Sequence, residues 1–202
     1  MPSTHRLPTL LPTLALTMAL TLFTLASSPA AAQVKIEGQT FAAQARLGDT
    51  DLKLNGVGLR AVAWLKGYAA GLYLTKKAGT AEEVMVATGP KRLSITMLRE
   101  IDSAELGKLF TRGVEDNSPR SEMSKLIPGL MRMSQIFSDQ KKLLPGENFL
   151  IEWVPGTGTV ITVKGKVQGE PFKEPEFFNA LMRIWLGPNP ADWKLKDALL
   201  GK

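Results

Sequence analysis

The chain has 202 residues, of which 44% are hydrophobic and 22% are charged, a composition typical of a globular protein rather than a disordered one. It contains no cysteine and a single histidine, His5, which excludes disulfides and thiolate nucleophiles. Beyond His5 the composition also excludes histidine-based catalytic triads and zinc sites built on imidazole or thiolate.

The first 32 residues have the pattern of a secretory signal peptide. Arg6 precedes an apolar run from Leu7 to Ala26, and Ala30–Ala32 form a small-residue cleavage site before Gln33. Two prolines interrupt the run, which disfavours the alternative of an uncleaved membrane anchor. We therefore expect export to the periplasm, cleavage between Ala32 and Gln33, and one domain over residues 33–202.

The predicted mature domain is moderately basic. It retains 24 Lys and Arg against 19 Asp and Glu, a net charge of +5, because Arg6 is the only charged residue before Gln33. The basic residues are scattered among acidic ones in short doublets, which argues against a nucleic-acid partner. No later stretch reaches the roughly 18 apolar residues of a spanning helix. The oligomeric state stays open.

The first half of the domain has the pattern of antiparallel strands. Alternating apolar residues separated by glycine and asparagine turns predict short strands, and the apolar density of Val62–Leu74 predicts a central strand that carries both tyrosines. In chain order we expect strands at 34–36, 40–47, 51–57 and 62–74, a short helix at 81–87 and a strand at 92–98.

The second half alternates helices and strands. Asp102 or Ser103 is a suitable cap for a helix that runs to about Glu115, and a second helix follows Pro119, with Pro128 and Gly129 as a potential break. We expect this second helix at 121–143, strands at 149–154, 159–164 and 166–168, and helices at 175–185 and 192–200. The order predicts an α+β fold, an antiparallel sheet with helices over one face.

General motifs do not identify the chemistry. Gly56-Val57-Gly58 and Gly156-Thr157-Gly158 do not continue into a dinucleotide-binding fingerprint, and both are interpreted as hairpin turns. Adjacent acidic pairs are typical of solvated surfaces. We expect no metal site and no cofactor.

Arg60 and Tyr68 are the strongest candidate binding residues. If both side chains point to one face of neighbouring strands, a guanidinium and a phenol can converge on one oxyanion in an apolar cleft. The alternative places Arg60 at a strand end on the surface and the hydroxyl of Tyr68 in water. Spacing alone favours this second interpretation.

Four segments together resemble the bacterial branch of the chalcone isomerase-like family. They are Asn55–Arg60, Lys66–Leu74, Val154–Thr159 and Phe177–Gly187. The resemblance spans nearly all of residues 34–202. It implies an open-faced antiparallel sheet covered by a layer of helices, with a ligand cleft between the two.

The resemblance also distinguishes a chalcone isomerase from a fatty-acid-binding protein. Arg60 matches the arginine that holds the substrate oxyanion in plant chalcone isomerases, but Tyr68 falls at their threonine, and Leu106 and Gly113 fall at their tyrosine and asparagine. Arg60 and Tyr68 instead match, in order, the arginine and tyrosine that hold the carboxylate in the plastid fatty-acid-binding relatives. We expect a non-catalytic periplasmic protein that binds a fatty acid or similar amphipathic carboxylate through these two residues.

Two alternatives stay open. The first is an isomerase, an intramolecular lyase acting on a chalcone-like or other phenolic or enolate substrate, in which Arg60 stabilises the oxyanion and Tyr68 donates a proton or orients water. The second is an envelope interaction protein whose cleft is vestigial.

Overall fold

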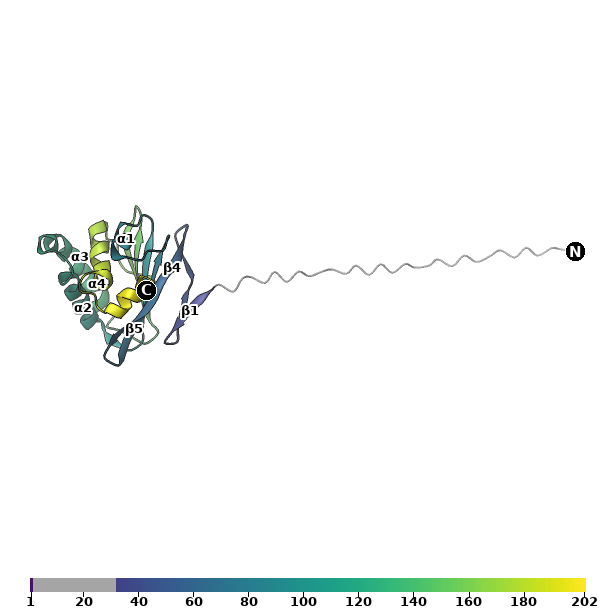
Figure 1. Ribbon diagram of the computed structural model, residues 1–202, viewed down its shortest axis with the longest axis horizontal. Helices are drawn as coiled ribbons and strands as arrows, with labels where there is room; N and C mark the ends of the chain where they lie inside the picture. Colours follow the sequence, from purple (N-terminus) through teal and green to yellow (C-terminus); the bar gives the residue numbers. More distant parts are fainter. Residues whose placement is uncertain (2–31) are drawn as a thin grey trace. The chain divides into compact units, whose positions relative to one another are not determined.

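The computed structural model describes Met1 and residues 32–202 (Figure 1). The predicted signal peptide falls outside the described residues, apart from Met1 and Ala32. The predicted strands and helices of the domain can all be compared with the structure.

A seven-stranded antiparallel sheet forms the centre of the domain, in the order β11-β10-β9-β6-β5-β4-β3. Two further strand pairs flank it, β1 with β2 and β7 with β8. The strands are β1 (Gln33–Ile36), β2 (Gln39–Ala42), β3 (Gln44–Leu47), β4 (Thr50–Val62), β5 (Leu65–Leu74), β6 (Lys91–Met97), β7 (Ile101–Asp102), β8 (Lys142–Leu143), β9 (Asn148–Val154), β10 (Gly158–Val163) and β11 (Lys166–Val167).

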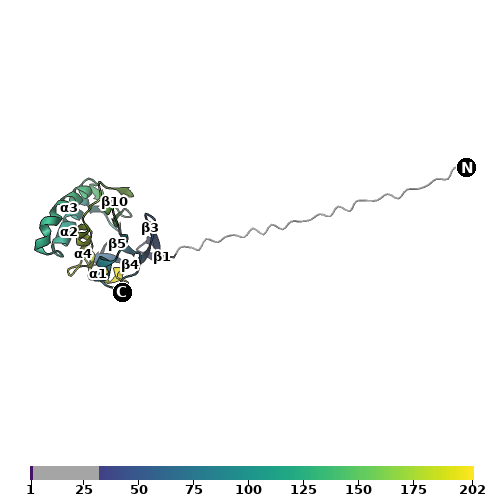
Figure 2. The ribbon, with the colours of Figure 1, turned by 90° about the horizontal axis from the view of Figure 1, so that it is seen from above.

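Helices cover one face of the sheet, which curls partway around them (Figure 2). They are α1 (Ala81–Val86), α2 (Ser103–Glu115), α3 (Arg120–Ser138), α4 (Pro175–Leu186) and α5 (Trp193–Leu199). The predicted cap of α2 is confirmed, because the carboxylate of Asp102 accepts hydrogen bonds from the backbone N–H groups of Ala104 and Glu105. The predicted α+β class is confirmed as well.

The prediction for the long helix α3 was wrong in two respects. The helix continues through Pro128 and Gly129, and it ends at Ser138 rather than near Leu143. Gly129 has a packing role, since a Cβ at this position would lie 2.5 Å from the ring of Phe177. The residues after Ser138 turn into β8 and pair with β7.

The single central strand predicted over Val62–Leu74 is also wrong at its start. β4 runs on to Val62, Ala63 takes a left-handed conformation with φ 52°, and β5 begins at Leu65. The apolar residues Val62–Leu65 therefore form the exposed tip of a hairpin rather than the start of a buried strand.

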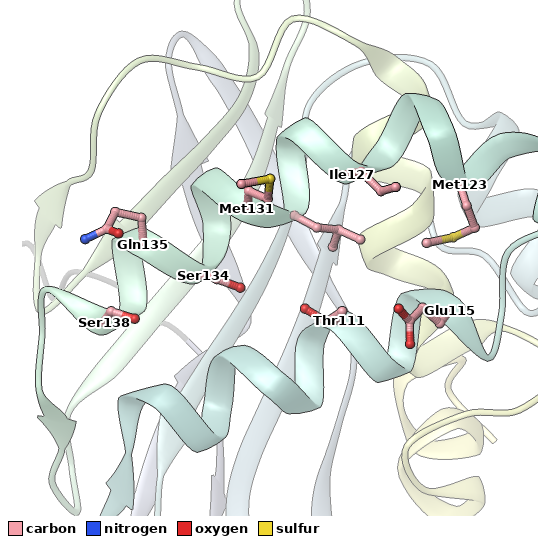
Figure 3. Close-up of a pocket in the computed structure, with 9 residues that line it drawn as sticks. Thr111, Glu115, Met123, Ile127, Met131, Ser134, Gln135 and Ser138 are labelled. Carbon is pink, nitrogen blue, oxygen red and sulfur yellow. The ribbon is translucent and has the colours of Figure 1, made fainter.

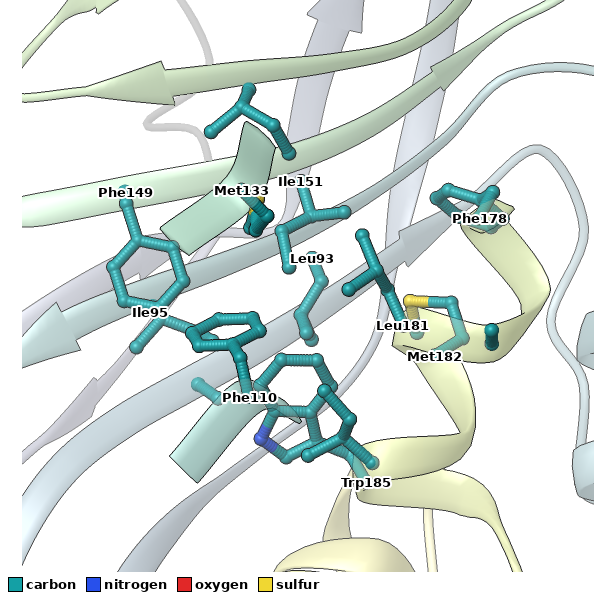
Figure 4. Packing of buried hydrophobic residues seen from close by; sticks show 14 of the residues in the cluster. Leu93, Ile95, Phe110, Met133, Phe149, Ile151, Phe178, Leu181, Met182 and Trp185 are labelled. Atoms are coloured by element: carbon teal, nitrogen blue, oxygen red, sulfur yellow. The ribbon is translucent and has the colours of Figure 1, made fainter. Parts of the chain in front are cut away.

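The main core lies between the sheet and the helices. Phe110, Phe149 and Trp185 lie close together there (Figure 4). Phe137 completes this aromatic cluster, with its ring stacked on that of Phe110 at 5.1 Å between centroids. A smaller core on the opposite face contains Tyr73. The two tyrosines of β5 thus face opposite sides of the sheet, because Tyr68 packs against the main core.

The Gly56-Val57-Gly58 segment lies within β4, so its interpretation as a hairpin turn was wrong. A Cβ at Gly56 would lie 1.9 Å from the carbonyl oxygen of Ala198, and one at Gly58 would lie 2.7 Å from the Cβ of Ala198. The two glycines let α5 pack directly on the strand. Gly156-Thr157-Gly158 does belong to the turn between β9 and β10, as predicted.

Candidate functional site

Arg60 and Tyr68 lie opposite each other on the two arms of the β4–β5 hairpin. They are cross-strand partners in the antiparallel register, as are Gly58 and Ala70 one step further along the same face. Because side chains alternate across a strand, Arg60 shares the face of Gly58, which α5 covers. The structure brings the two predicted residues together on the helix-covered side of the sheet, and both are half-buried.

Both residues line one cavity of about 270 Å³ between the sheet and the helix layer. Its walls combine apolar side chains with a few polar ones, which is the usual composition of a small-molecule site. The lining residues are Arg60, Tyr68, Leu106, Leu109, Phe110, Arg112, Gly113, Asp116, Phe149, Ile184, Trp185, Asn189, Pro190 and Ala191.

The phenol of Tyr68 is oriented by Trp185. The indole Nε1 of Trp185 donates a hydrogen bond to the Tyr68 oxygen at 2.8 Å. Burial raises the pKa of Tyr68 to about 12, although the Trp185 hydrogen bond and the positive charge of Arg60 both favour the phenolate. The phenol is therefore protonated at neutral pH. Since Tyr68 is the acceptor in its bond to Trp185, its own proton can be donated to a ligand.

The guanidinium of Arg60 keeps most of its donors available. Its Nη1 donates to the carbonyl oxygen of Ala61 at 3.0 Å. Within residues 32–202, no carboxylate forms an ion pair with Arg60. A cation beside a protonated phenol, both facing one cavity, is an arrangement that can bind an oxyanion.

Arg112, which no sequence pattern singled out, is a second guanidinium on the cavity wall. It lies in the last turn of α2 and is exposed, and Asp116 lines the wall one turn later. The α2 sequence alone gives no reason to single out Arg112, because a basic residue near a helix C-terminus is common for electrostatic reasons. Only the packing of α2 over the sheet brings it to the same cavity as Arg60.

The two positions that the resemblance aligns with the plant tyrosine and asparagine lie at this cavity, but neither holds a polar side chain. Leu106 and Gly113 both line it. A Cβ at Gly113 would lie 2.9 Å from the side chain of Ile184, so an asparagine would not fit there without displacing that side chain. The nearby amide of Asn117 is already engaged, because it bonds backbone atoms of Gly113 and Asn189.

A second hollow, on the outside of the helix layer, is separate from this site. Figure 3 shows the groove of about 350 Å³ between α2 and α3, with Thr111, Glu115 and Met131 on its walls. It includes neither Arg60 nor Tyr68. Over the described part of the chain, no group of three or more acidic or histidine residues is arranged to hold a metal ion.

Comparison with known proteins identifies the family. The family model described as chalcone isomerase-like matches residues 32–201. The chain belongs to the chalcone isomerase-like family. Among solved structures, this family member is similar to a fatty-acid binding protein of Arabidopsis thaliana, with 19% sequence identity and a TM-score of 0.66 over 84% of this chain and 96% of the other. No match is found among curated proteins.

These matches confirm the predicted resemblance and the predicted fold. At 19% identity the plant structure shows the architecture of the chalcone isomerase-like domain. The helices of residues 32–202 include none that is long and apolar enough to cross a bilayer.

Proposed function

We propose that this chalcone isomerase-like protein binds a fatty acid or a similar amphipathic carboxylate without transforming it. The observation that carries the proposal is the pairing of Arg60 with Tyr68 across two neighbouring strands, at the wall of an otherwise largely apolar cavity. The ligand class named in the plant structure of the same fold supports the same conclusion.

The carboxylate would accept hydrogen bonds from the free edge of the Arg60 guanidinium and from the Tyr68 hydroxyl. When a ligand fills the cavity, the guanidinium and the phenol lose their hydrogen bonds to water. The carboxylate replaces those bonds, and its negative charge makes the new hydrogen bonds stronger. Trp185 fixes the phenol in the orientation that directs its proton away from the indole.

The acyl chain would lie on Leu106, Phe110 and Phe149, where each buried methylene contributes about 0.8 kcal/mol. A cavity of about 270 Å³ lies just below the usual range of ligand pockets, which run from roughly 300 to 1,000 Å³. This size favours a medium-chain acid over a long one.

The isomerase alternative has less support from the geometry. Among the described residues at the cavity, the positions of the plant tyrosine and asparagine are occupied by Leu106 and Gly113. A phenol whose pKa is about 12 is also far from the neutral pH at which a general acid is most effective. The interaction-protein alternative predicts a vestigial cleft, whereas the residues between the sheet and the helices line a cavity of about 270 Å³.

Displacement of a fluorescent fatty acid by decanoate tests the proposal. We expect Arg60→Ala to weaken decanoate binding by roughly tenfold to a hundredfold, since a hydrogen bond to a charged group contributes about 1.5 to 3 kcal/mol. Arg120→Ala removes the same group from an exposed position outside the cavity and should bind like the wild type. Equal affinities of the wild type and Arg60→Ala would refute the head-group site.

Ring closure of a chalcone that is faster with the wild type than in buffer alone would instead support the isomerase.

We also propose that the protein acts in the periplasm, because a signal-peptide pattern precedes Gln33.

A further inference from the structure

The tip of the β4–β5 hairpin exposes several large apolar side chains to solvent. Trp64 is 83% exposed, and its neighbours Val62 and Leu65 are exposed as well. Single exposed apolar residues are ordinary, but adjacent ones at the end of a projecting hairpin form a patch. This patch is the segment that the sequence pattern assigns to a buried strand.

A second exposed tryptophan directly follows a residue that is hydrogen-bonded to this hairpin. Trp193 is 60% exposed at the first turn of α5. The carboxylate of the preceding residue, Asp192, accepts a hydrogen bond from the backbone N–H of Ala61 at 3.2 Å. That bond fastens the start of α5 to the hairpin, so Trp64 and Trp193 belong to one region. We name Val62, Trp64, Leu65 and Trp193 the tryptophan patch.

Basic side chains accompany the tryptophan patch. The two segments that carry it, residues 60–67 and 191–197, contain Arg60, Lys66, Lys194 and Lys196 against Asp192 and Asp197. Arg60 faces the cavity and Lys66 pairs with Glu37 at 2.7 Å, so the basic side chains beside Trp193 are Lys194, which is exposed, and Lys196. The carboxylate of Asp192 is engaged by backbone N–H groups. The ammonium of Lys196 lies 5.1 Å from the centre of the Trp193 ring, so cation and aromatic ring are presented together.

This combination is the chemistry of a lipid interface. Tryptophan places its ring among headgroups and acyl-chain ends, where its apolar body and its N–H are both satisfied. Basic residues nearby are attracted to anionic headgroups. A protein partner would account for the apolar side chains alone, whereas a lipid interface also accounts for Lys194 and Lys196 beside Trp193.

We propose that the tryptophan patch docks the protein peripherally on an anionic phospholipid bilayer. Docking would bring the ligand cavity to the membrane, since Arg60 and Tyr68 lie at the base of the same hairpin and the cavity residues Pro190 and Ala191 directly precede Asp192. The docking itself depends only on exposed side chains. Transfer of a ligand from the bilayer into the cavity rests on the proposed function.

Flotation with vesicles of phosphatidylethanolamine and phosphatidylglycerol tests the docking. We expect the full exported protein to float with these vesicles and to bind phosphatidylcholine vesicles less. The double variant Trp64→Ser/Trp193→Ser should lower the bound fraction by about tenfold or more, because each tryptophan can bury roughly 150 to 250 Å² of largely apolar surface. Its urea unfolding midpoint should stay near that of the wild type, since both side chains are exposed.

The matched control is Ile127→Ser/Met131→Ser, which removes two exposed apolar side chains from the groove of Figure 3. It should float like the wild type. The docking is overturned if the wild type stays unbound, if the control variant loses as much binding as the tryptophan variant, or if the patch instead mediates a dimer that the tryptophan variant dissociates.

The same variants separate this inference from the proposed function. The tryptophan variant should retain wild-type affinity for soluble decanoate when vesicles are absent, because neither tryptophan lines the cavity. A wild type that floats but does not bind decanoate would refute the fatty-acid function and leave the docking intact.

Discussion

Tyr68 contributes one directed hydrogen-bond donor to the proposed head-group site. Tyr68→Phe should therefore weaken decanoate binding by roughly five- to tenfold, the effect of losing one hydrogen bond of about 1 to 1.5 kcal/mol. Tyr73→Phe removes the same group from the opposite face of β5 and should leave the affinity unchanged. Calorimetric titration measures both, and equal affinities of the Tyr68 and Tyr73 variants would contradict the assigned role.

The buried phenol of Tyr68 also makes an alkaline stability prediction. Its pKa is raised from 10.0 to about 12, so the folded state favours the protonated form. The associated stability is present in full below pH 10 and is lost as the pH rises from 10 to 12. The free energy of unfolding should fall by roughly 2 to 3 kcal/mol over this interval, at about 1.4 kcal/mol per pKa unit.

Urea unfolding between pH 9 and pH 12 measures this loss. Tyr68→Phe should show a shallower decline than the wild type, and the remaining slope should come in part from Tyr73, whose pKa burial also raises. An identical slope in the wild type and Tyr68→Phe would show that the phenol is not the buried acid described above.

At the site, sequence reasoning could identify Arg60 and Tyr68 because the family resemblance marks both positions. It could not choose from spacing alone between a shared cavity and a surface location, since the β-bulge between Arg60 and Ala61 changes which face each later residue takes. Arg112 and Trp185 come from helices far along the chain, and only tertiary packing brings them to the cavity.

At the scale of elements, the glycines of β4 determine how closely α5 can approach. Gly58→Ala would place a Cβ 2.7 Å from that of Ala198, and overpacking of this kind costs about 1 to 3 kcal/mol. Gly67→Ala adds the same methyl group in the same hairpin at an ordinary distance of 3.5 Å from the Arg60 oxygen. Urea unfolding should show a clear loss for Gly58→Ala and a small change for Gly67→Ala, and the reverse order would contradict the packing.

Most elements follow from local pattern, and the exceptions have physical causes. The cap at Asp102 and the period of α2 define that helix well in the sequence. The Val62–Leu65 turn has an apolar composition typical of a strand, and the glycine at 129 is typical of a helix end. Local sequence does not show that Val62–Leu65 lie at an exposed hairpin tip, or that the ring of Phe177 packs against Gly129.

At the scale of the whole molecule, the proposed export has a direct consequence for the N-terminus. If the signal peptide is removed as proposed, the exported protein should begin at Gln33. Intact-mass measurement of periplasmic protein checks this, and a retained mass that includes residues 1–32 would contradict cleavage.

A crystal structure of the exported protein with decanoate would test the central claim most directly. We predict the carboxylate within hydrogen-bond distance of the Arg60 guanidinium and the Tyr68 hydroxyl, with the chain against Phe110 and Phe149. Decanoate seated in the groove between α2 and α3, or bound with its carboxylate away from Arg60, would contradict the proposed function.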